Sequence, residues 1–169
     1  MVENSHSDII KAILKREDPS GLGVVTNDPA DTGGLTQFGL TKRDNPAEWA
    51  DGKVTSDEAY HAYERKYLHG PGYAKIPSTH RRILGQLVDF GVNSGPGVAT
   101  KKLQEILGVE TDGVFGEETL AALIQRNDAE VNNKLVQARV KMICKIVKAN
   151  PSQLKWLNGW VNRAFEFQV

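Results

Sequence analysis

Two acidic residues and a hydroxyl early in the chain have the types and spacing that cleavage of a glycosidic bond requires. Glu17 follows Ile10 by seven residues and Ile13 by four, which places it on the apolar face of a predicted helix. A carboxyl group partly withdrawn from water at the C-terminal end of a helix favours its protonated form, as a general acid requires. Asp31 would supply a second carboxylate, and Thr36 a hydroxyl that holds a water molecule.

The same residues also fit purely structural roles. Glu17 could turn back into water at the frayed end of its helix and pair with Lys11 or Arg16. Residues 28–34 (Asp-Pro-Ala-Asp-Thr-Gly-Gly) have the composition of an ordinary turn. Position alone therefore leaves the roles of Glu17 and Asp31 open.

Most other catalytic arrangements are absent from the sequence. The histidines show neither the His-x-x-x-His nor the His-Glu-x-x-His spacing of a zinc site, and there is no Gly-x-Ser-x-Gly elbow or phosphate-binding loop. Cys144 is the one cysteine, which excludes an internal disulfide and a thiolate zinc site. It lies in the apolar run 142–147, which predicts a small buried thiol rather than a nucleophile. We therefore expect no metal and no other cofactor.

Aromatic, amide and guanidinium side chains near the C-terminus have the chemistry to stack on sugar rings. The cluster contains Trp156, Asn158, Trp160, Asn162, Arg163 and Phe165. Trp160 is the member that we expect to contact a substrate, although its helical spacing equally fits a core position.

Helices dominate the secondary structure that the sequence predicts. Ser5 and Ser7 are capping candidates for a first helix that ends just before Pro19, and Thr55 opens a capping box. Further helices are predicted over residues 55–68, 78–92, 96–107, 117–126, 129–149 and 151–167. The alternating segment 35–41 is the one good β signal and predicts a short strand or hairpin. The predicted fold class is mainly α, with a small β element near the N-terminus.

The composition is that of an ordinary globular domain without charge bias. The chain has 169 residues, and its 21 Lys and Arg balance 21 Asp and Glu. This balance argues against a nucleic-acid partner, because phosphate binding needs clustered basic residues. No stretch approaches the ~20 apolar residues of a membrane span, so we expect no stable membrane insertion. Residues 1–8 lack the features of a signal peptide, which predicts synthesis in the cytosol.

Residues 27–41 (Asn-Asp-Pro-Ala-Asp-Thr-Gly-Gly-Leu-Thr-Gln-Phe-Gly-Leu-Thr) resemble the signature of glycoside hydrolase family 108, N-acetylmuramidases of the phage endolysin type. Later segments resemble the family's second half, described as a peptidoglycan-binding module, at residues 89–97, 103–109 with 112–116, and 159–163. The resemblance implies a lysozyme-like α+β fold with two helical lobes. Residues 1–94 would form the catalytic half and residues 95–169 the peptidoglycan-binding half, packed as one globule.

The activity that the resemblance implies is hydrolysis of the β-1,4 bond between N-acetylmuramic acid and N-acetylglucosamine. Glu17 would protonate the leaving oxygen, Asp31 would stabilise the transition state or activate water, and Thr36 would place that water. The expected substrate-binding residues are Phe38, Asn93 and Trp160. The implied partner is bacterial peptidoglycan, met by a monomer in the periplasm after release from the host cytoplasm, for example through a holin.

One departure from the family pattern concerns the acid. The family's glutamate is followed directly by Gly-Gly-Tyr, whereas Glu17 is followed by residues 18–23 (Asp-Pro-Ser-Gly-Leu-Gly), which implies an inserted loop. Asp18 is then the alternative acid, and Phe38 stands where the family usually has tyrosine. The alternative function is a non-catalytic peptidoglycan-binding or secretion-assisting wall protein of the same fold. In the second half, we expect residues 112–116 to form a structural turn that contacts no sugar.

Overall fold

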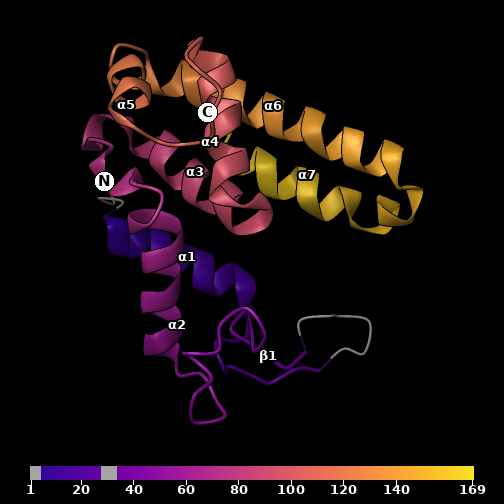
Figure 1. Ribbon diagram of the computed structural model, residues 1–169. Helices are drawn as coiled ribbons and strands as arrows, with labels where there is room; N and C mark the ends of the chain where they lie inside the picture. The colour runs from indigo at the N-terminus through magenta and orange to yellow at the C-terminus, as the bar shows by residue number, and fades with distance from the viewer. Residues whose placement is uncertain (1–4, 28–33) are drawn as a thin grey trace. The chain divides into compact units, whose positions relative to one another are not determined.

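The computed structural model describes residues 5–27 and 34–169, drawn as a ribbon in Figure 1. The chain divides into two compact units, residues 1–70 and 71–169. The predicted division between residues 94 and 95 stays a prediction, and that position lies between two helices of the second unit.

Two capped helices and a π-helical segment make up the helical part of the first unit. Its helical elements are α1 (His6–Glu17), α2 (Ser56–Tyr63) and the π-helical η1 (Glu64–His69). Ser5, one of the two candidate caps, forms a capping box with Asp8 at the start of α1. Thr55 forms the predicted capping box with Glu58 at the start of α2. The two helices pack together, and the buried side chains of α1 include Ile10. The caps mark where the two helices begin, and α1 ends at Glu17, just before Asp18 donates its N–H to the carbonyl of Leu14.

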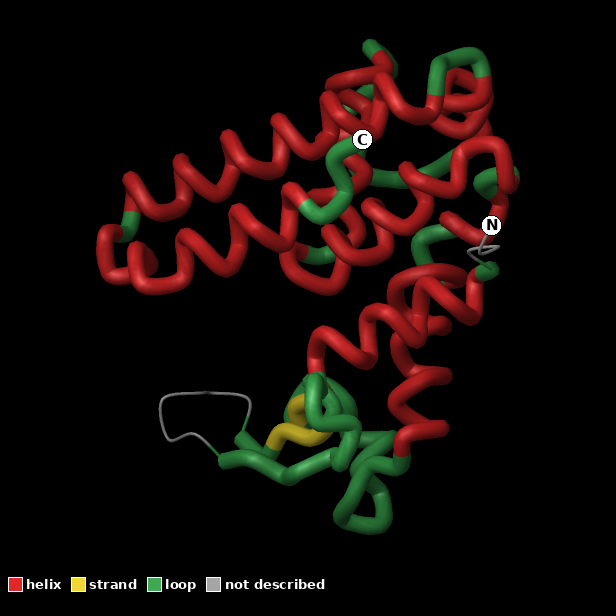
Figure 2. The backbone as a smooth tube through the Cα atoms, turned by 180° about the vertical axis from the view of Figure 1, so that it is seen from behind, coloured by secondary structure: helices red, strands yellow, loops and turns green. Residues whose placement is uncertain are grey.

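The β element predicted over residues 35–41 is a short hairpin. Strand β1 (Thr36–Gln37) pairs antiparallel with β2 (Leu40–Thr41), and both lie among the loops of the first unit (Figure 2). The two turn residues, Phe38 and Gly39, have φ angles of 50° and 75°. A two-residue hairpin turn of the type I′ class needs positive φ at both positions. Phe38 is the one non-glycine residue of the described part with a positive φ, so the hairpin holds it in a strained conformation.

Five helices form the second unit, close to the predicted ranges. They are α3 (Arg81–Ser94), α4 (Pro96–Leu107), α5 (Glu117–Ile124), α6 (Asp128–Ala149) and α7 (Leu157–Phe165), with 3₁₀ turns η2 (Tyr73–Lys75), η3 (Ser78–His80) and η4 (Pro151–Trp156). The long α6 packs against α3, α4 and α7. Phe90, Leu103 and Leu135, from three of these helices, are completely buried in the core.

A buried cluster of ion pairs joins three helices of this unit. The carboxylate of Asp89 on α3 is fully buried and lies 2.7 Å from Arg139 of α6 and 2.8 Å from Arg163 of α7. Charged groups removed from water are stable only when they are paired in this way. Arg163, which the sequence placed in a sugar-stacking cluster, therefore also has a structural role.

The prediction that Cys144 is buried was wrong, because its side chain is exposed. Its neighbour Ile143 is buried, and each step along an α-helix rotates the side chain by about 100°. Cys144 therefore turns away from the core, and even the apolar Ile146 in the same run is 40% exposed. An apolar run near the end of a long helix is buried along one side only.

The turn after α4 is held by the buried side chain of Gln104. Oδ1 of Asp112 accepts hydrogen bonds from Nε2 of Gln104 and from the N–H of Val114, both at 2.8 Å. Oε1 of Gln104 accepts from the N–H of Gly113 at 2.9 Å, and Gly113 has a φ of 83°. The hydrogen bonds from Val114 and Gln104 lower the pKa of Asp112. This arrangement supports the prediction of a structural turn.

We expect Asp112→Ala to lower the melting temperature near neutral pH without weakening binding to isolated cell walls. The pKa of Asp112 is lower in the folded chain, so its stabilisation is present at neutral pH and is lost as the pH falls through that pKa. Thermal unfolding at neutral and strongly acidic pH checks this, with Glu110→Ala as the control at an exposed neighbour. An unchanged melting temperature with lost wall binding would assign Asp112 to ligand binding instead.

Candidate active site

Glu17 is the last residue of α1, and its side chain meets the turn of the β-hairpin. A Cβ atom added to Gly39 would lie 3.2 Å from Oε2 of Glu17, 3.0 Å from its Cβ and 2.5 Å from the hydroxyl oxygen of Tyr63. The carboxyl group is half-buried at this meeting point. Gly39 therefore allows the hairpin to approach Glu17 more closely than any other residue would.

Two tyrosines border this carboxyl group. The hydroxyl of Tyr63 donates a hydrogen bond to the backbone carbonyl of Phe38 at 3.0 Å, and the Tyr63 ring stacks on Tyr67 with centroids 5.7 Å apart. Burial raises the pKa of Tyr67, and the negative charge of Glu17 raises it further. Neither tyrosine was predicted as a site residue, although both lie in the predicted helix 55–68, where a spacing of four residues places side chains on one face.

Asp18, the alternative acid, is occupied by the loop that follows it. Its carboxylate accepts hydrogen bonds from Oγ of Ser20 at 2.5 Å and from the N–H of Gly23 at 2.7 Å. These hydrogen bonds lower the pKa of Asp18. A general acid must carry a proton near neutral pH, so this environment suits Asp18 to ordering the inserted loop and not to proton donation.

Gln37 fastens the inserted loop to the hairpin. Its Nε2 donates to the carbonyl of Gly23 at 2.7 Å, and its Oε1 accepts from the N–H of Val54 at 2.7 Å. The ring of Phe38 packs directly on Gly23, where a Cβ atom would lie only 2.3 Å from Cζ of the ring. Phe38, a predicted substrate-binding residue, thus supports the loop and also lines a pocket of about 330 Å³ beside Asp18.

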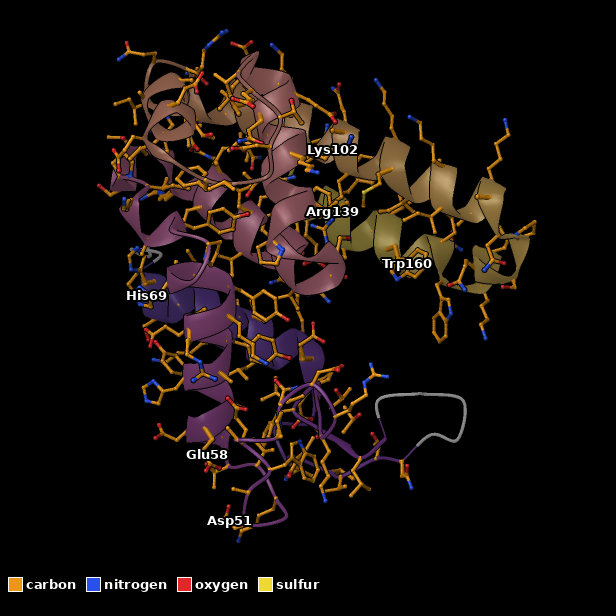
Figure 3. The ribbon with its side chains drawn as sticks, in the orientation of Figure 1. Asp51, Glu58, His69, Lys102, Arg139 and Trp160 are labelled. Carbon is orange, nitrogen blue, oxygen red and sulfur yellow. The ribbon has the colours of Figure 1, made fainter. Side chains whose placement is uncertain are left out.

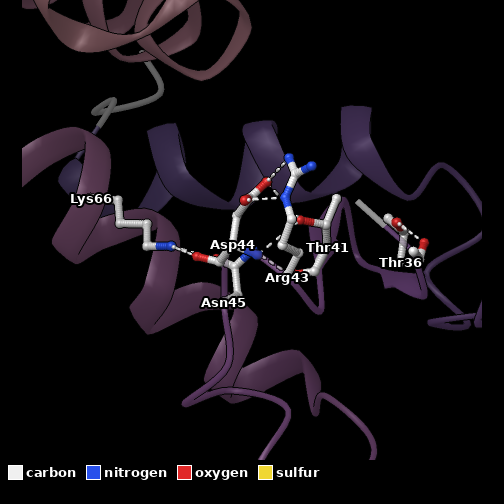
Figure 4. Close-up of polar contacts among 7 residues, drawn as sticks. Thr36, Thr41, Arg43, Asp44, Asn45 and Lys66 are labelled. Atoms are coloured by element: carbon white, nitrogen blue, oxygen red, sulfur yellow. Dashed lines mark hydrogen bonds and ion pairs between the residues drawn. The ribbon is translucent and has the colours of Figure 1, made fainter. Parts of the chain in front are cut away.

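Thr36 is half-buried beside the same loop. Its Oγ1 donates a hydrogen bond to the carbonyl of Gly34 at 3.2 Å (Figure 4). A hydroxyl that donates in this way keeps its oxygen lone pairs for accepting a hydrogen bond from water. The N–H and carbonyl of Thr36 pair with Thr26, which fixes the strand. The other predicted catalytic residue, Asp31, lies outside the described residues.

Polar contacts after β2 hold the hairpin against η1, as Figure 4 shows. Nζ of Lys66 donates to Oδ1 of Asn45 at 2.5 Å and to the carbonyl of Asp44 at 3.1 Å. Nδ2 of Asn45 donates to the carbonyl of Thr41 at 2.8 Å. Hydrogen bonds from Arg43 and Thr41 lower the pKa of Asp44. The hairpin turn is thereby tied to the helical segment that carries Tyr67.

The remaining two predicted substrate-binding residues share a pocket in the second unit. Asn93 and Trp160 line a pocket of about 140 Å³ together with Ser94, Arg139, Met142, Ile143 and Ile146. Nδ2 of Asn93 donates to the carbonyl of Asp89 at 2.9 Å, which fixes the amide. Trp160 lies on α7 and Arg139 on the adjacent α6 (Figure 3). The fold thus brings Asn93 and Trp160, which are far apart in the sequence, to the same pocket.

Residues 5–27 and 34–169 contain no group of three His, Cys, Asp or Glu side chains that could hold a metal ion. Among the helices of this same part, none combines the length and apolar character of a membrane span.

Comparisons with known proteins show the family of this chain. The Glycosyl hydrolase 108 model matches residues 10–95, which include Glu17 and the hairpin, and a model described as a predicted peptidoglycan domain matches residues 98–165. The solved structure of SagA from Brucella abortus is similar, with a TM-score of 0.76 and 25% sequence identity over 98% of this chain and 92% of that chain. No curated protein sequence matches significantly. The predicted mainly helical, lysozyme-like α+β fold is confirmed, and the chain belongs to the glycosyl hydrolase 108 family.

Proposed function

We propose that this protein is an N-acetylmuramidase that hydrolyses the β-1,4 bond between N-acetylmuramic acid and N-acetylglucosamine in bacterial peptidoglycan. The observation that carries the proposal is the position of Glu17, half-buried against Gly39 and Tyr63 within the segment that matches a glycosyl hydrolase family. The match of residues 98–165 to a predicted peptidoglycan domain supports the choice of substrate.

In the proposed reaction, Glu17 donates its proton to the glycosidic oxygen as the bond from that oxygen to C1 of N-acetylmuramic acid breaks. Water then supplies the hydroxyl group at C1, and its proton passes to a carboxylate. On sequence grounds Asp31 is that second carboxylate, or it stabilises the positive charge at C1. Thr36 would accept a hydrogen bond from the attacking water. Tyr63 and Tyr67 would hold the Glu17 side chain in place.

Each unit has its own candidate substrate-binding residues in this proposal. Trp160 would stack on a sugar ring, and Asn93, whose Nδ2 is held by Asp89, would offer its amide oxygen to an N-acetyl N–H. Phe38 would contact the glycan from the hairpin turn. We further propose that the protein acts as a monomer on the periplasmic wall after release from the cytosol.

Product analysis on purified cell walls tests the bond that is cleaved. The digest is reduced with borohydride and examined by mass spectrometry. A muramidase produces fragments that end in reduced N-acetylmuramic acid, whereas a glucosaminidase produces ends of reduced N-acetylglucosamine. Binding to the walls without release of any fragment would favour the non-catalytic wall protein instead.

We expect fragment release to continue at an unchanged rate in EDTA. The proposed chemistry needs only carboxyl groups and water, and the sequence has neither zinc-binding histidine spacing nor a second cysteine. The rate of fragment release with and without EDTA, measured on the same walls, checks this. Loss of activity that added Zn²⁺ restores would contradict the muramidase proposal and favour a metal-dependent hydrolase.

A further inference from the structure

A lysine-rich groove lies between α4 and α6 in the second unit. It has a volume of about 370 Å³ and is separate from the pocket that holds Asn93 and Trp160, although Met142 borders both. Four lysines line it, Lys102, Lys134, Lys141 and Lys145, against one acidic residue, Glu105. Lys102 of α4 lies beside α6 in Figure 3. In a chain of zero net charge, this local excess of positive charge is a distinct feature.

Two of the four lysines already have partners and two do not. Lys102 pairs with Glu105 at 2.7 Å, and Lys134 pairs with Glu130 at 2.6 Å. Within the described part of the chain, Lys141 and Lys145 make no ion pair with any acidic side chain. Both are exposed on successive turns of α6, so their ammonium groups can meet a ligand at the groove.

The floor of the groove is apolar. Ile106, Ala138 and Met142 are half-buried and lie between the lysines. An apolar floor with cationic edges suits a ligand that carries small methyl side chains along its length and carboxylates at its sides. A polymer of phosphates would use the lysines but not the floor.

We propose that this groove binds the stem peptide of peptidoglycan through the peptide's free carboxylates, an inference that rests on peptidoglycan being the substrate. The glycan strand itself is uncharged wherever its lactyl groups are linked to peptide, so the carboxylates lie on the stem peptide. Stem peptides are rich in alanine, whose methyl groups fit the apolar floor. Lys141 and Lys145 are the residues that bind the carboxylates.

The length of the lysine row agrees with this ligand. Lys134 and Lys145 are eleven residues apart on one helix, and a rise of 1.5 Å per residue separates their Cα atoms by roughly 16 Å. An extended peptide of four or five residues spans roughly 13–18 Å at about 3.3–3.6 Å per residue. One stem peptide can therefore lie along the whole row.

The test is a calorimetric titration of the full-length protein with a free stem tetrapeptide. We expect the double variant Lys141→Gln/Lys145→Gln to bind about tenfold more weakly, with a smaller dependence on salt, because two exposed ion pairs are lost. Lys11→Gln/Lys53→Gln, which removes the same net charge from exposed sites in the first unit, is the control and should bind like the wild type. Lys141→Arg/Lys145→Arg should keep the affinity.

Two results would overturn the proposal. One is equal binding of a tetrapeptide whose carboxylates are converted to amides. The other is binding of polyphosphate without any binding of the tetrapeptide, which would assign the groove to phosphate polymers. The outcome is independent of catalysis, because the titration contains no glycan. Cleavage of glycan strands freed of peptide, measured separately, should be the same for the double variant and the wild type.

Discussion

Glu17→Gln is expected to lower the rate of fragment release from cell walls by ~10²–10⁴-fold, the usual contribution of a general acid. Glutamine keeps the size and the hydrogen-bonding capacity of the side chain, but it has no proton to give to the leaving oxygen. The fold should be unaffected or slightly more stable, because the change removes an ionisable group from a half-buried position. Initial rates and melting temperatures of the two proteins check both expectations.

Asp18→Asn is the matched control at the neighbouring carboxylate. The loop holds Asp18 through Ser20 and Gly23, so this change should loosen the loop and lower the rate far less than Glu17→Gln does. Asp31→Asn is expected to lie between the two, because water can partly replace a carboxylate that acts by its charge. A Glu17→Gln protein that works at nearly the wild-type rate, beside an inactive Asp18→Asn protein, would move the acid to Asp18.

Gly39→Ala should lower the rate of fragment release by about 10²-fold, the effect expected when a reacting group is displaced by about 1 Å. The new methyl group would lie 2.5 Å from the Tyr63 hydroxyl oxygen and 3.2 Å from Oε2 of Glu17, so one of these groups must move. Since Tyr63 also bonds to the carbonyl of Phe38, its shift would disturb the hairpin turn as well. Rates on cell walls, together with melting temperatures, measure the effect.

The control for backbone strain is Gly52→Ala in the same unit. Gly52 has a φ of 84°, close to the 75° of Gly39, but no atom lies within 4 Å of the position of its added Cβ. Backbone strain should make both variants less stable by about 1 kcal/mol, because alanine is disfavoured at positive φ, and Gly39→Ala adds the cost of crowding. Only Gly39→Ala should lose activity. If Gly52→Ala loses as much, the loss arises from general destabilisation and not from crowding at Glu17.

Local sequence patterns were sufficient for the secondary structure. Thr55 was predicted as a cap because a capping box involves residues only three positions apart, and Ser5 was one of two candidate caps for the first helix. The alternation of residues 35–41 predicted a short strand or hairpin, and apolar periodicity predicted the helices of the second unit. The family resemblance also came from short motifs whose residues are adjacent in the chain. All of these signals are contained in a few consecutive residues.

The surroundings of Glu17 depended on contacts between distant segments. Its neighbours Gly39 and Tyr63 are more than twenty residues away, and no periodicity along the chain indicates which side chain of α2 faces the end of α1. On sequence grounds Asp18 is an alternative acid. Only the structure shows that its carboxylate accepts a hydrogen bond from the loop residue Gly23.

The second unit illustrates the same division between local and distant information. The sequence by itself determined that α6 is a helix, because its apolar residues recur with a period of 3.6 residues. Only the tertiary structure decided which turns of that helix are covered. It left Cys144 exposed, paired Arg139 with the buried Asp89, and set the lysine row beside α4 to form a groove. Which side chains are buried and which charges are paired depends on how neighbouring helices pack, and that packing involves the whole chain.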